Sequence, residues 1–225
     1  MSDRYVVNSR TLKGDWPALV LILGMFIAGL VVYPHLPEQV PSHFNVRGEI
    51  DAYSSRLWGA FGIPLLSAGI YVLMLVVPFI DPKRQNYAGF LGGYRVIRTA
   101  MVAFMAVLHA VILAVALGCN VSVNTVVPVM LGLLFIVLGR VLGGIRFNYF
   151  VGIRTPWTLA DEEVWRRTHE MSGRLFVVAG LASVISGVLP APANFWLSIG
   201  AISVAGGGSL VYSYFVYARR HWAKK

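Results

Sequence analysis

Long apolar stretches alternate with short charged clusters along the whole chain. Six stretches of roughly 20 residues have apolar centres without Lys, Asp or Glu, at about 17–36, 57–80, 96–117, 123–142, 172–190 and 195–217. A helix needs about 20 such residues to cross the hydrocarbon core of a bilayer. The stretches lack the alternating polar and apolar faces of a soluble helix. The pattern therefore predicts an all-α polytopic membrane protein with six transmembrane helices and the lipid bilayer as its surroundings.

The basic residues predict which way these helices run. Of the 19 Lys and Arg residues, 17 fall in the alternate segments that include both chain ends, and only Arg47 and Arg56 fall between the other spans. Basic residues are enriched on the cytoplasmic side of membranes. We therefore expect both termini in the cytoplasm. The net charge of +9 does not indicate direct binding of nucleic acid, because the basic residues flank apolar spans and form no continuous patch.

One long connection, about 37–56, is expected outside the cell. We expect a short extended piece from Val40 to Phe44 and a turn from Asn45 to Gly48, since Asn and Gly tolerate positive φ. Its polar residues match no specific metal-ligand spacing. Recognition of an extracellular molecule is favoured, because exposed loops on a rigid scaffold often carry function. The candidate recognition residues are His43, Phe44, Asn45, Gly48, Glu49, Asp51 and Arg56.

The other long connection, about 143–171, is expected in the cytoplasm. Thr158 followed by Asp161 resembles a capping box, and it predicts a short amphipathic helix over about 159–171, which either ends there or continues directly into the span at 172–190. Glu162 with Arg166, and Glu163 with Arg167, have the spacing of helix ion pairs, or else they form a solvated helix face. The candidate signalling residues of this loop are Asn148, Gly152, Arg154, Thr155, Pro156, Trp157, Thr158, Asp161, Glu162, Trp165, Thr168 and His169.

Two of these side chains leave alternatives open. Arg154 follows Gly152 and precedes a proline, so a stiff turn holds it, and it could pair with Asp161 or with an acid of a partner protein. His169 could respond to pH, but a hydrogen bond at the helix surface or in an interface is favoured.

Within the spans, polar residues and glycines predict packing. His109 is the one titratable candidate near the middle of a span, and we expect a neutral ring bonded to a neighbouring helix. Gly173, Gly180 and Gly187 recur every seven residues and predict a face that another helix approaches closely. No metal or cofactor site is predicted, and the single cysteine, Cys119, excludes an internal disulfide.

Taken together, the two loops resemble two known signatures. The outer loop, with Pro41-Ser42-His43-Phe44-Asn45, Gly48-Glu49 and Asp51, resembles the bacterial domain of unknown function DUF1648. The inner loop, with Gly152-Ile153-Arg154-Thr155-Pro156-Trp157-Thr158 and Asp161-Glu162-Glu163-Val164-Trp165, resembles the SdpI/YfhL family. The order of these modules is similar too, and it implies a DUF1648-like module at 1–95 and an SdpI-like module at 96–225.

The resemblance implies a function. It suggests a bacterial plasma-membrane immunity protein that protects the cell against a secreted antimicrobial peptide toxin. It also implies a receptor role, in which the toxin-bound protein holds a cytoplasmic winged-helix repressor at the membrane. The outer loop would then meet the toxin and the inner loop the repressor.

Two other classes of function are weighed against this. A small-molecule or peptide transporter needs a polar cavity near the membrane midplane, and the spans offer few ionisable groups there. A membrane enzyme needs a converging catalytic set, and the one acidic cluster, Asp161 to Glu163 with His169, is spread around a helix by its spacing. We therefore expect no enzymatic activity.

Overall fold

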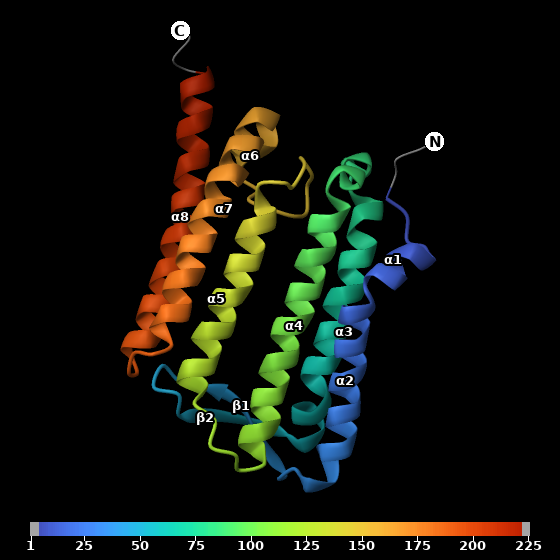
Figure 1. Cartoon of the computed structure of the whole chain (residues 1–225), viewed down its shortest axis with the longest axis vertical. Helices are drawn as coiled ribbons and strands as arrows, with labels where there is room; N and C mark the ends of the chain where they lie inside the picture. Colours follow the sequence, from blue (N-terminus) through green and yellow to red (C-terminus); the bar gives the residue numbers. More distant parts are fainter. Residues whose placement is uncertain (1–4, 222–225) are drawn as a thin grey trace.

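The computed structural model describes residues 5–221 as an elongated helical bundle. Figure 1 shows a small β-hairpin at one end of the bundle and the end of the last helix at the other. We call these the hairpin end and the terminal end. Three of the basic residues behind the predicted sidedness, Arg4, Lys224 and Lys225, lie outside the described residues.

The bundle consists of two halves that follow each other in the chain. The first half holds α1 (Ser9–Gly14), α2 (Trp16–Val32), η1 (Tyr33–His35), β1 (Gln39–Phe44), β2 (Ile50–Ser55), α3 (Arg56–Ile80), η2 (Arg84–Phe90) and α4 (Leu91–Ala116). The second half holds α5 (Val123–Leu142), α6 (Pro156–Ala160), α7 (Glu162–Ser186) and α8 (Ala193–His221). Helices α2, α3 and α4 pack on one another, as do α5, α7 and α8, and the contact of α4 with α5 joins the halves (Figure 1).

Five helical segments among the described residues are long and apolar enough to cross a membrane. They are 16–35, 56–80, 84–116, 123–142 and 193–221, and they correspond to five of the six predicted spans. The remaining predicted span, 172–190, is the apolar part of α7, a 25-residue helix whose first turns are charged. Because of these charged turns, α7 is not counted among the five helices that are apolar enough to cross a membrane. It nevertheless runs between α5 and α8 along the bundle (Figure 1).

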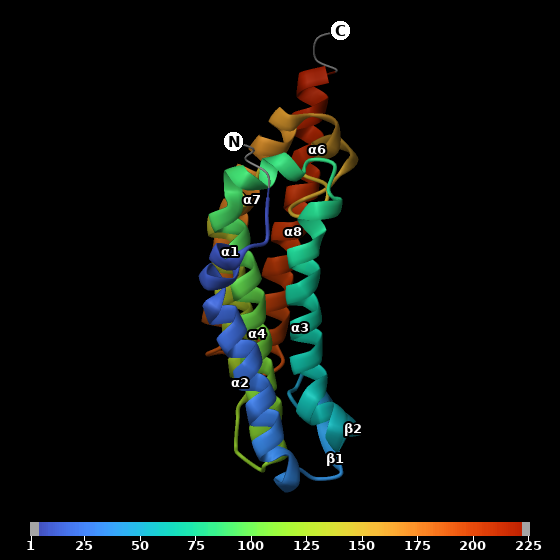
Figure 2. The same ribbon diagram turned by 90° about the vertical axis from the view of Figure 1, so that its right-hand side faces the viewer.

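The expectation of an all-α fold is wrong at the hairpin end. β1 and β2 form an antiparallel hairpin at the foot of α3, as Figure 2 shows. Its turn has the expected Gly48 with φ of 77°. The buried Val40 of β1 packs against α3 at Gly59, where an added Cβ would lie 2.5 Å from the valine side chain. Ser55 then starts α3, since its hydroxyl accepts a hydrogen bond from the Trp58 amide at 3.4 Å.

The helix expected over 159–171 is present from Glu162 and continues directly into the predicted span 172–190 as part of α7. Thr155 and Thr158 form the capping box of the short helix α6, so the predicted box of Thr158 with Asp161 is wrong. Asp161 is instead the N-cap of α7, and the chain continues from there as one helix to Ser186. An aspartate can start a helix because its carboxylate accepts the otherwise unpaired first amides.

The glycine repeat of α7 makes the predicted close contact, and its partner is α5. A Cβ on Gly180 would lie 2.6 Å from the carbonyl oxygen of Gly132, and one on Gly173 would lie 2.7 Å from that of Gly139. The two backbones therefore touch, which only small residues allow. His109 likewise makes the expected helix-to-helix bond, with Nε2 lying 3.0 Å from the Ala60 carbonyl oxygen.

Candidate functional site

A mostly apolar cavity of about 460 Å³ lies under the hairpin, between the two halves of the bundle. Apolar side chains of α3, α4, α5 and α8 form its walls, among them Leu66, Leu108 and Val127. Polar groups of the hairpin, α5 and α8 also line it, namely Ser42, His43, Asn45, Asn124, Asn194 and Ser198. Such a combination of apolar walls and a few polar groups is typical of a ligand pocket.

Two asparagines fasten the hairpin to the second half of the bundle. Nδ2 of Asn124, near the start of α5, donates to the Arg47 carbonyl at the hairpin tip, at 2.6 Å. Nδ2 of Asn194, in α8, donates in turn to the Asn124 carbonyl at 2.5 Å. The neighbouring Gly48 lies against Asn124, where a Cβ would meet the amide group. The hairpin of the first half thus reaches across the cavity and rests on the second half.

The predicted recognition residues fall into two groups around this cavity. His43, Phe44 and Asn45 line it, whereas Gly48, Glu49, Asp51 and Arg56 are not part of its wall.

Residues outside the cavity wall hold the side chains that line it. The ring nitrogen Nδ1 of His43 lies 2.6 Å from the Asp51 carboxylate, and the Asn45 amide donates to Glu49 at 2.9 Å. Arg56 lies with its guanidinium 5.9 Å from the Tyr33 ring centre. The hairpin therefore places three of the seven predicted side chains at the cavity and uses at least two of the others to orient them.

At the terminal end, Asn148 organises the loop that follows α5. This side chain is fully buried, and its Oδ1 accepts hydrogen bonds from the amides of Phe150 and Val151 at 2.9 and 2.7 Å. Its Nδ2 donates to the carbonyls of Arg146 and Val151. Its Oδ1 also accepts from the Tyr87 hydroxyl of η2 at 3.4 Å. The hydrogen bonds of Asn148 thus hold its own loop together and tie it to η2, so this candidate has a structural role.

Trp165 and His169 form the buried base of the same loop. Trp165 donates from Nε1 to the Ile145 carbonyl at 2.9 Å, and its ring stacks on His169 with 4.1 Å between centres. Nε2 of His169 accepts from the Ile153 amide at 2.9 Å, which leaves Nδ1 to donate to the Trp165 carbonyl at 2.8 Å. This pattern requires a neutral ring, and burial lowers the pKa of His169 to about 4.

Gly152 is required beside that histidine. Its φ of 114° belongs to the region that favours glycine, and a Cβ there would collide with Nε2 of His169. The interface hydrogen bond favoured for His169 is confirmed, and the reason for the glycine follows from it.

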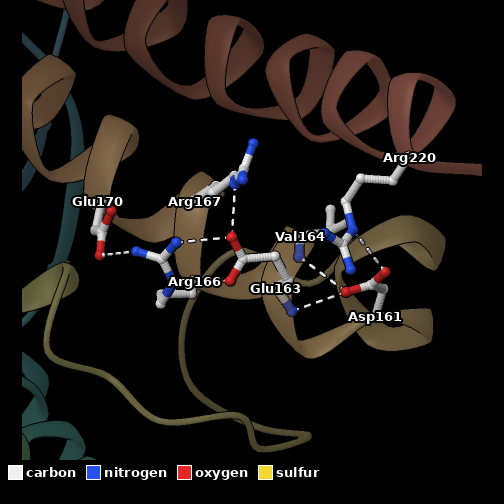
Figure 3. Close-up of polar contacts among 7 residues, drawn as sticks. All are labelled: Asp161, Glu163, Val164, Arg166, Arg167, Glu170 and Arg220. Carbon is white, nitrogen blue, oxygen red and sulfur yellow. Dashed lines mark hydrogen bonds and ion pairs between the residues drawn. The ribbon is translucent and has the colours of Figure 1, made fainter.

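Asp161 connects the start of α7 to the end of α8 (Figure 3). Oδ1 accepts from the amides of Glu163 and Val164 at 2.8 and 3.2 Å, and Oδ2 accepts from Nε of Arg220 at 3.0 Å. His221 lies 2.9 Å from the same oxygen. Burial opposes ionisation, but these hydrogen bonds outweigh it and hold the pKa of Asp161 at about 2.

The charges on the exposed face of α7 pair differently from the expectation. Glu163 binds both Arg166 at 2.7 Å and Arg167 at 2.6 Å, and Arg166 also binds Glu170 at 2.7 Å (Figure 3). The predicted pair of Glu163 with Arg167 is therefore confirmed, but Glu162 lies nearest Lys83, at 3.9 Å, instead of Arg166.

Arg154 does not pair with Asp161, because that carboxylate is occupied by α8. Its Nη1 donates instead to the Tyr149 carbonyl at 2.8 Å, and the side chain stays exposed. Of the twelve candidate signalling residues, only Gly152, Arg154, Pro156 and Glu162 are exposed, while Asn148, Thr155, Thr158, Trp165, Thr168 and His169 are buried. Most of the motif therefore builds the loop, and a few residues present a surface.

The sequence interpretation missed several polar residues that join the parts of the bundle. At the hairpin end these are Asn124 and Asn194. At the terminal end, buried Asp81 accepts from the Tyr87 hydroxyl at 2.9 Å and from the Tyr149 amide at 3.0 Å, and so links η2 to the loop after α5. One feature of the sequence could have indicated these residues. Each is a lone Asn or Asp at the edge of an apolar stretch, with no neighbouring residue in the sequence that accounts for a polar side chain there.

A second missed group is an ion pair at the start of α2. Asp15 is fully buried, with Nη2 of Arg98 at 2.5 Å and the Tyr71 hydroxyl at 3.1 Å. A buried charge needs such a partner, because its desolvation is costly. The contact ties α2, α3 and α4 together. Within residues 5–221, no group of three or more His, Cys, Asp and Glu could hold a metal ion.

The apolar helices, with one polar structure at each end, define a multi-pass bacterial membrane protein. Residues 144–213 match the model of the SdpI/YfhL protein family, and residues 20–68 match the domain of unknown function DUF1648. The chain is also similar to the immunity protein SdpI of Bacillus subtilis (strain 168), with 23% identity over 169 residues, or 75% of this chain and 79% of the relative. No solved structure matches the chain. The resemblance expected from the two loops is thereby confirmed.

Proposed function

We propose that this protein is a membrane immunity protein and receptor that binds a secreted antimicrobial peptide at the hairpin end. The observation that carries the proposal is the cavity under the hairpin, with its apolar walls and its few amide and imidazole groups. The relative's name, an immunity protein, supplies the class of function.

The proposed arrangement has six spans, with α7 as the fifth, and both chain ends in the cytoplasm. Its support is the length of α7 and the excess of basic residues at the terminal end. In this orientation the hairpin faces the outside, where a secreted peptide arrives. The DUF1648-like module supplies the hairpin, and the SdpI-like module supplies Asn124 and Asn194 beneath it.

The shape of the cavity favours part of an amphipathic peptide as the ligand. A volume of about 460 Å³ accommodates a few apolar side chains but no whole peptide. The remainder of the peptide would lie on the hairpin, where His43 and Asn45 offer hydrogen-bonding groups. The mostly apolar lining gives no support to a transporter for polar molecules, since such a substrate would lose its hydration without compensation.

We further propose that the exposed residues at the terminal end contact a cytoplasmic repressor. Arg154 and Glu162 are the exposed charged members of the motif, and the ion-paired row from Glu163 to Glu170 lies beside them on α7. Trp165 is a poor test of this contact, because it is buried and its loss would disturb the loop itself.

The peptide site is tested by filling the cavity. Val127→Trp places a large ring in the cavity wall, and Val204→Trp is the matched control, because Val204 is 73% exposed on α8. Both variants are expressed in a toxin-sensitive bacterium, and survival against the purified peptide is measured at equal membrane levels of protein. We expect the control to protect as the unaltered chain does and Val127→Trp to lose protection. Equal protection by both variants would refute the cavity as the site.

The output surface is tested separately. Arg154→Ala should leave protection and membrane insertion intact while abolishing peptide-induced transcription from a repressor-controlled reporter. Retention of full induction would show that Arg154 does not contact the repressor.

A further inference from the structure

A groove crosses the contact of α5 with α7 near the terminal end of the bundle. It has a volume of about 580 Å³ and is open to one side of the molecule. Arg140, in the last turn of α5, and Arg174 of α7 both line it. They flank the point where Gly139 and Gly173 bring the two backbones into contact. Two guanidinium groups on neighbouring helices therefore share one groove.

In the described part of the chain, these two arginines have no bound partner, unlike most other arginines of the same end; Arg146 and Arg219 are likewise unpaired. Arg84 and Arg154 donate to backbone carbonyls, while Arg98, Arg166 and Arg220 bind carboxylates. Within residues 5–221, neither Arg140 nor Arg174 makes a hydrogen bond or an ion pair, and both are exposed. Two positive charges on neighbouring helices, neither of them bound to a carboxylate, create a local site for an anion.

The one carboxylate in the groove does not neutralise them. Glu170 lines the groove, but its Oε1 is held by Nη1 of Arg166 at 2.7 Å, one turn back on α7. A second cavity adjoins the groove at Gly143, Gly144 and Glu170. It adds Arg146 and Arg166 and also Glu162 and Glu163, of which Glu163 is paired with Arg166 and Arg167. The local balance of charge is therefore positive.

The surface beyond the arginines is apolar and exposed. Toward the hairpin end, Arg174 is followed on its own side of α7 by Val178, Leu181 and Ile185, which are 63%, 49% and 63% exposed. On α5, Val137 and Leu133 lie three and seven residues before Arg140; Val137 is half-buried and Leu133 is 45% exposed. Residues spaced by three, four or seven share one face of a helix. Two apolar stripes thus run along the spans and end at the two arginines.

We propose that this groove binds an anionic phospholipid, with its phosphodiester headgroup between Arg140 and Arg174 and its acyl chains along the two apolar stripes. Arginine binds phosphate oxygens with paired N–H donors. Basic pockets between spans on the cytoplasmic side suit such headgroups. Glycines at 143 and 144 leave the floor of the groove open, which lets the headgroup approach both guanidinium groups. The apolar stripes distinguish a lipid from a free phosphate ion, which would use only the arginines.

The proposal takes its leaflet, the cytoplasmic one, from the proposed orientation, but lipid binding itself does not depend on the immunity function. The test uses the purified full chain in detergent, with phosphatidylglycerol or phosphatidylcholine of equal acyl chains added in a titration. Native mass spectrometry measures the lipid-bound fraction. We expect the chain to retain phosphatidylglycerol preferentially. Arg140→Gln with Arg174→Gln should weaken that binding by about tenfold or more.

Two further variants separate a site from a general attraction of charge. Arg47→Gln with Arg219→Gln removes the same charge far from the groove, and its affinity should stay within about twofold of the unaltered chain. Gly144→Leu keeps both arginines and fills the groove floor, where an added Cβ meets only a carbonyl oxygen at 3.5 Å. It should therefore fold and lose lipid.

Three results would overturn the proposal. They are equal retention of the two lipids, equal weakening by both double variants, and displacement of phosphatidylglycerol by millimolar inorganic phosphate. The last result would identify a free phosphate as the ligand. Full toxin protection by the cavity variant, together with preferential retention of phosphatidylglycerol, would refute the peptide site and support the lipid site.

Discussion

Removal of the Asp161 carboxylate should loosen the start of α7 by a predictable amount. In Asp161→Ala the amides of Glu163 and Val164 lose their cap, which costs about 1 kcal/mol. The contacts with Arg220 and His221 are lost as well, and a partly exposed ion pair contributes up to about 1 kcal/mol. The total is about 2 kcal/mol.

The pKa of Asp161 gives a similar magnitude. A value of about 2 lies roughly two units below the ordinary aspartate pKa, and each unit corresponds to about 1.4 kcal/mol. Because the folded-state pKa is lowered, this contribution is present above pH about 4 and is lost as the pH falls through about 2. The contribution of Asp161 to the stability of the α7 start should therefore be constant from pH 7 to about 4 and decrease below it.

Hydrogen–deuterium exchange of the Glu163 and Val164 amides, measured at pH 7 in detergent, tests the magnitude. A loss of about 2 kcal/mol corresponds to roughly 30-fold faster exchange in Asp161→Ala. Asp161→Asn keeps a capping oxygen and should accelerate exchange by only about fivefold. Glu162→Ala is the control, since its carboxylate lies 3.9 Å from Lys83 and caps nothing. Exchange that is equal in the Ala and Asn variants would refute the separate contribution of the cap.

Three other predictions concern single contacts. Burial lowers the pKa of His169 to about 4, so its contribution to stability is full above pH about 6.5 and is lost on acidification toward 4. Protection of the Ile153 amide, corrected for intrinsic exchange, should therefore fall about tenfold per pH unit in that window. A flat profile would contradict the neutral ring. Gly180→Leu should lower thermal stability in detergent by about 1–3 kcal/mol, because the larger side chain overpacks against α5. Gly206→Leu is the control and should not lower it, since a Cβ there meets nothing within 4 Å. Equal melting temperatures of the two variants would refute the backbone contact. Asn124→Ala should accelerate amide exchange in the hairpin about fivefold, since one hydrogen bond contributes about 1 kcal/mol; unchanged exchange would mean that the tip is held by other contacts.

The sequence predicted the parts of this fold that depend on period and composition. The apolar stretches located five spanning segments, four of them to within about four residues at each end, while the third was predicted to start 12 residues too late. The seven-residue glycine repeat predicted the α7 contact. Both signals are local, since length and small side chains suffice to produce them. The resemblance of the two loops was likewise carried by contiguous motifs.

The parts that could not be predicted depend on residues far apart in the chain. Val40 is buried only because α3 presents Gly59 to it, and the Asn124 amide has a role only where the hairpin tip reaches α5. Asp161, and not Thr158, caps α7, because its Oδ1 accepts the Glu163 and Val164 amides; its second oxygen has a role only because α8 brings Arg220 and His221 to it. The candidate motif at the terminal end was identified as a set, but burial alone distinguishes its structural members from exposed Arg154.

The glycine contacts of α5 with α7 have a consequence for any attempt to observe the protein at work. Helices whose backbones touch cannot slide or tilt against each other without losing that contact, so α5 and α7 move as one body. A displacement of the first half caused by a ligand must then occur relative to this body, across the seam that the hairpin bridges. Pairs of spectroscopic labels should therefore span that seam, with one label on α3 and one on α8, and a pair placed on α5 and α7 serves as the internal reference of constant length.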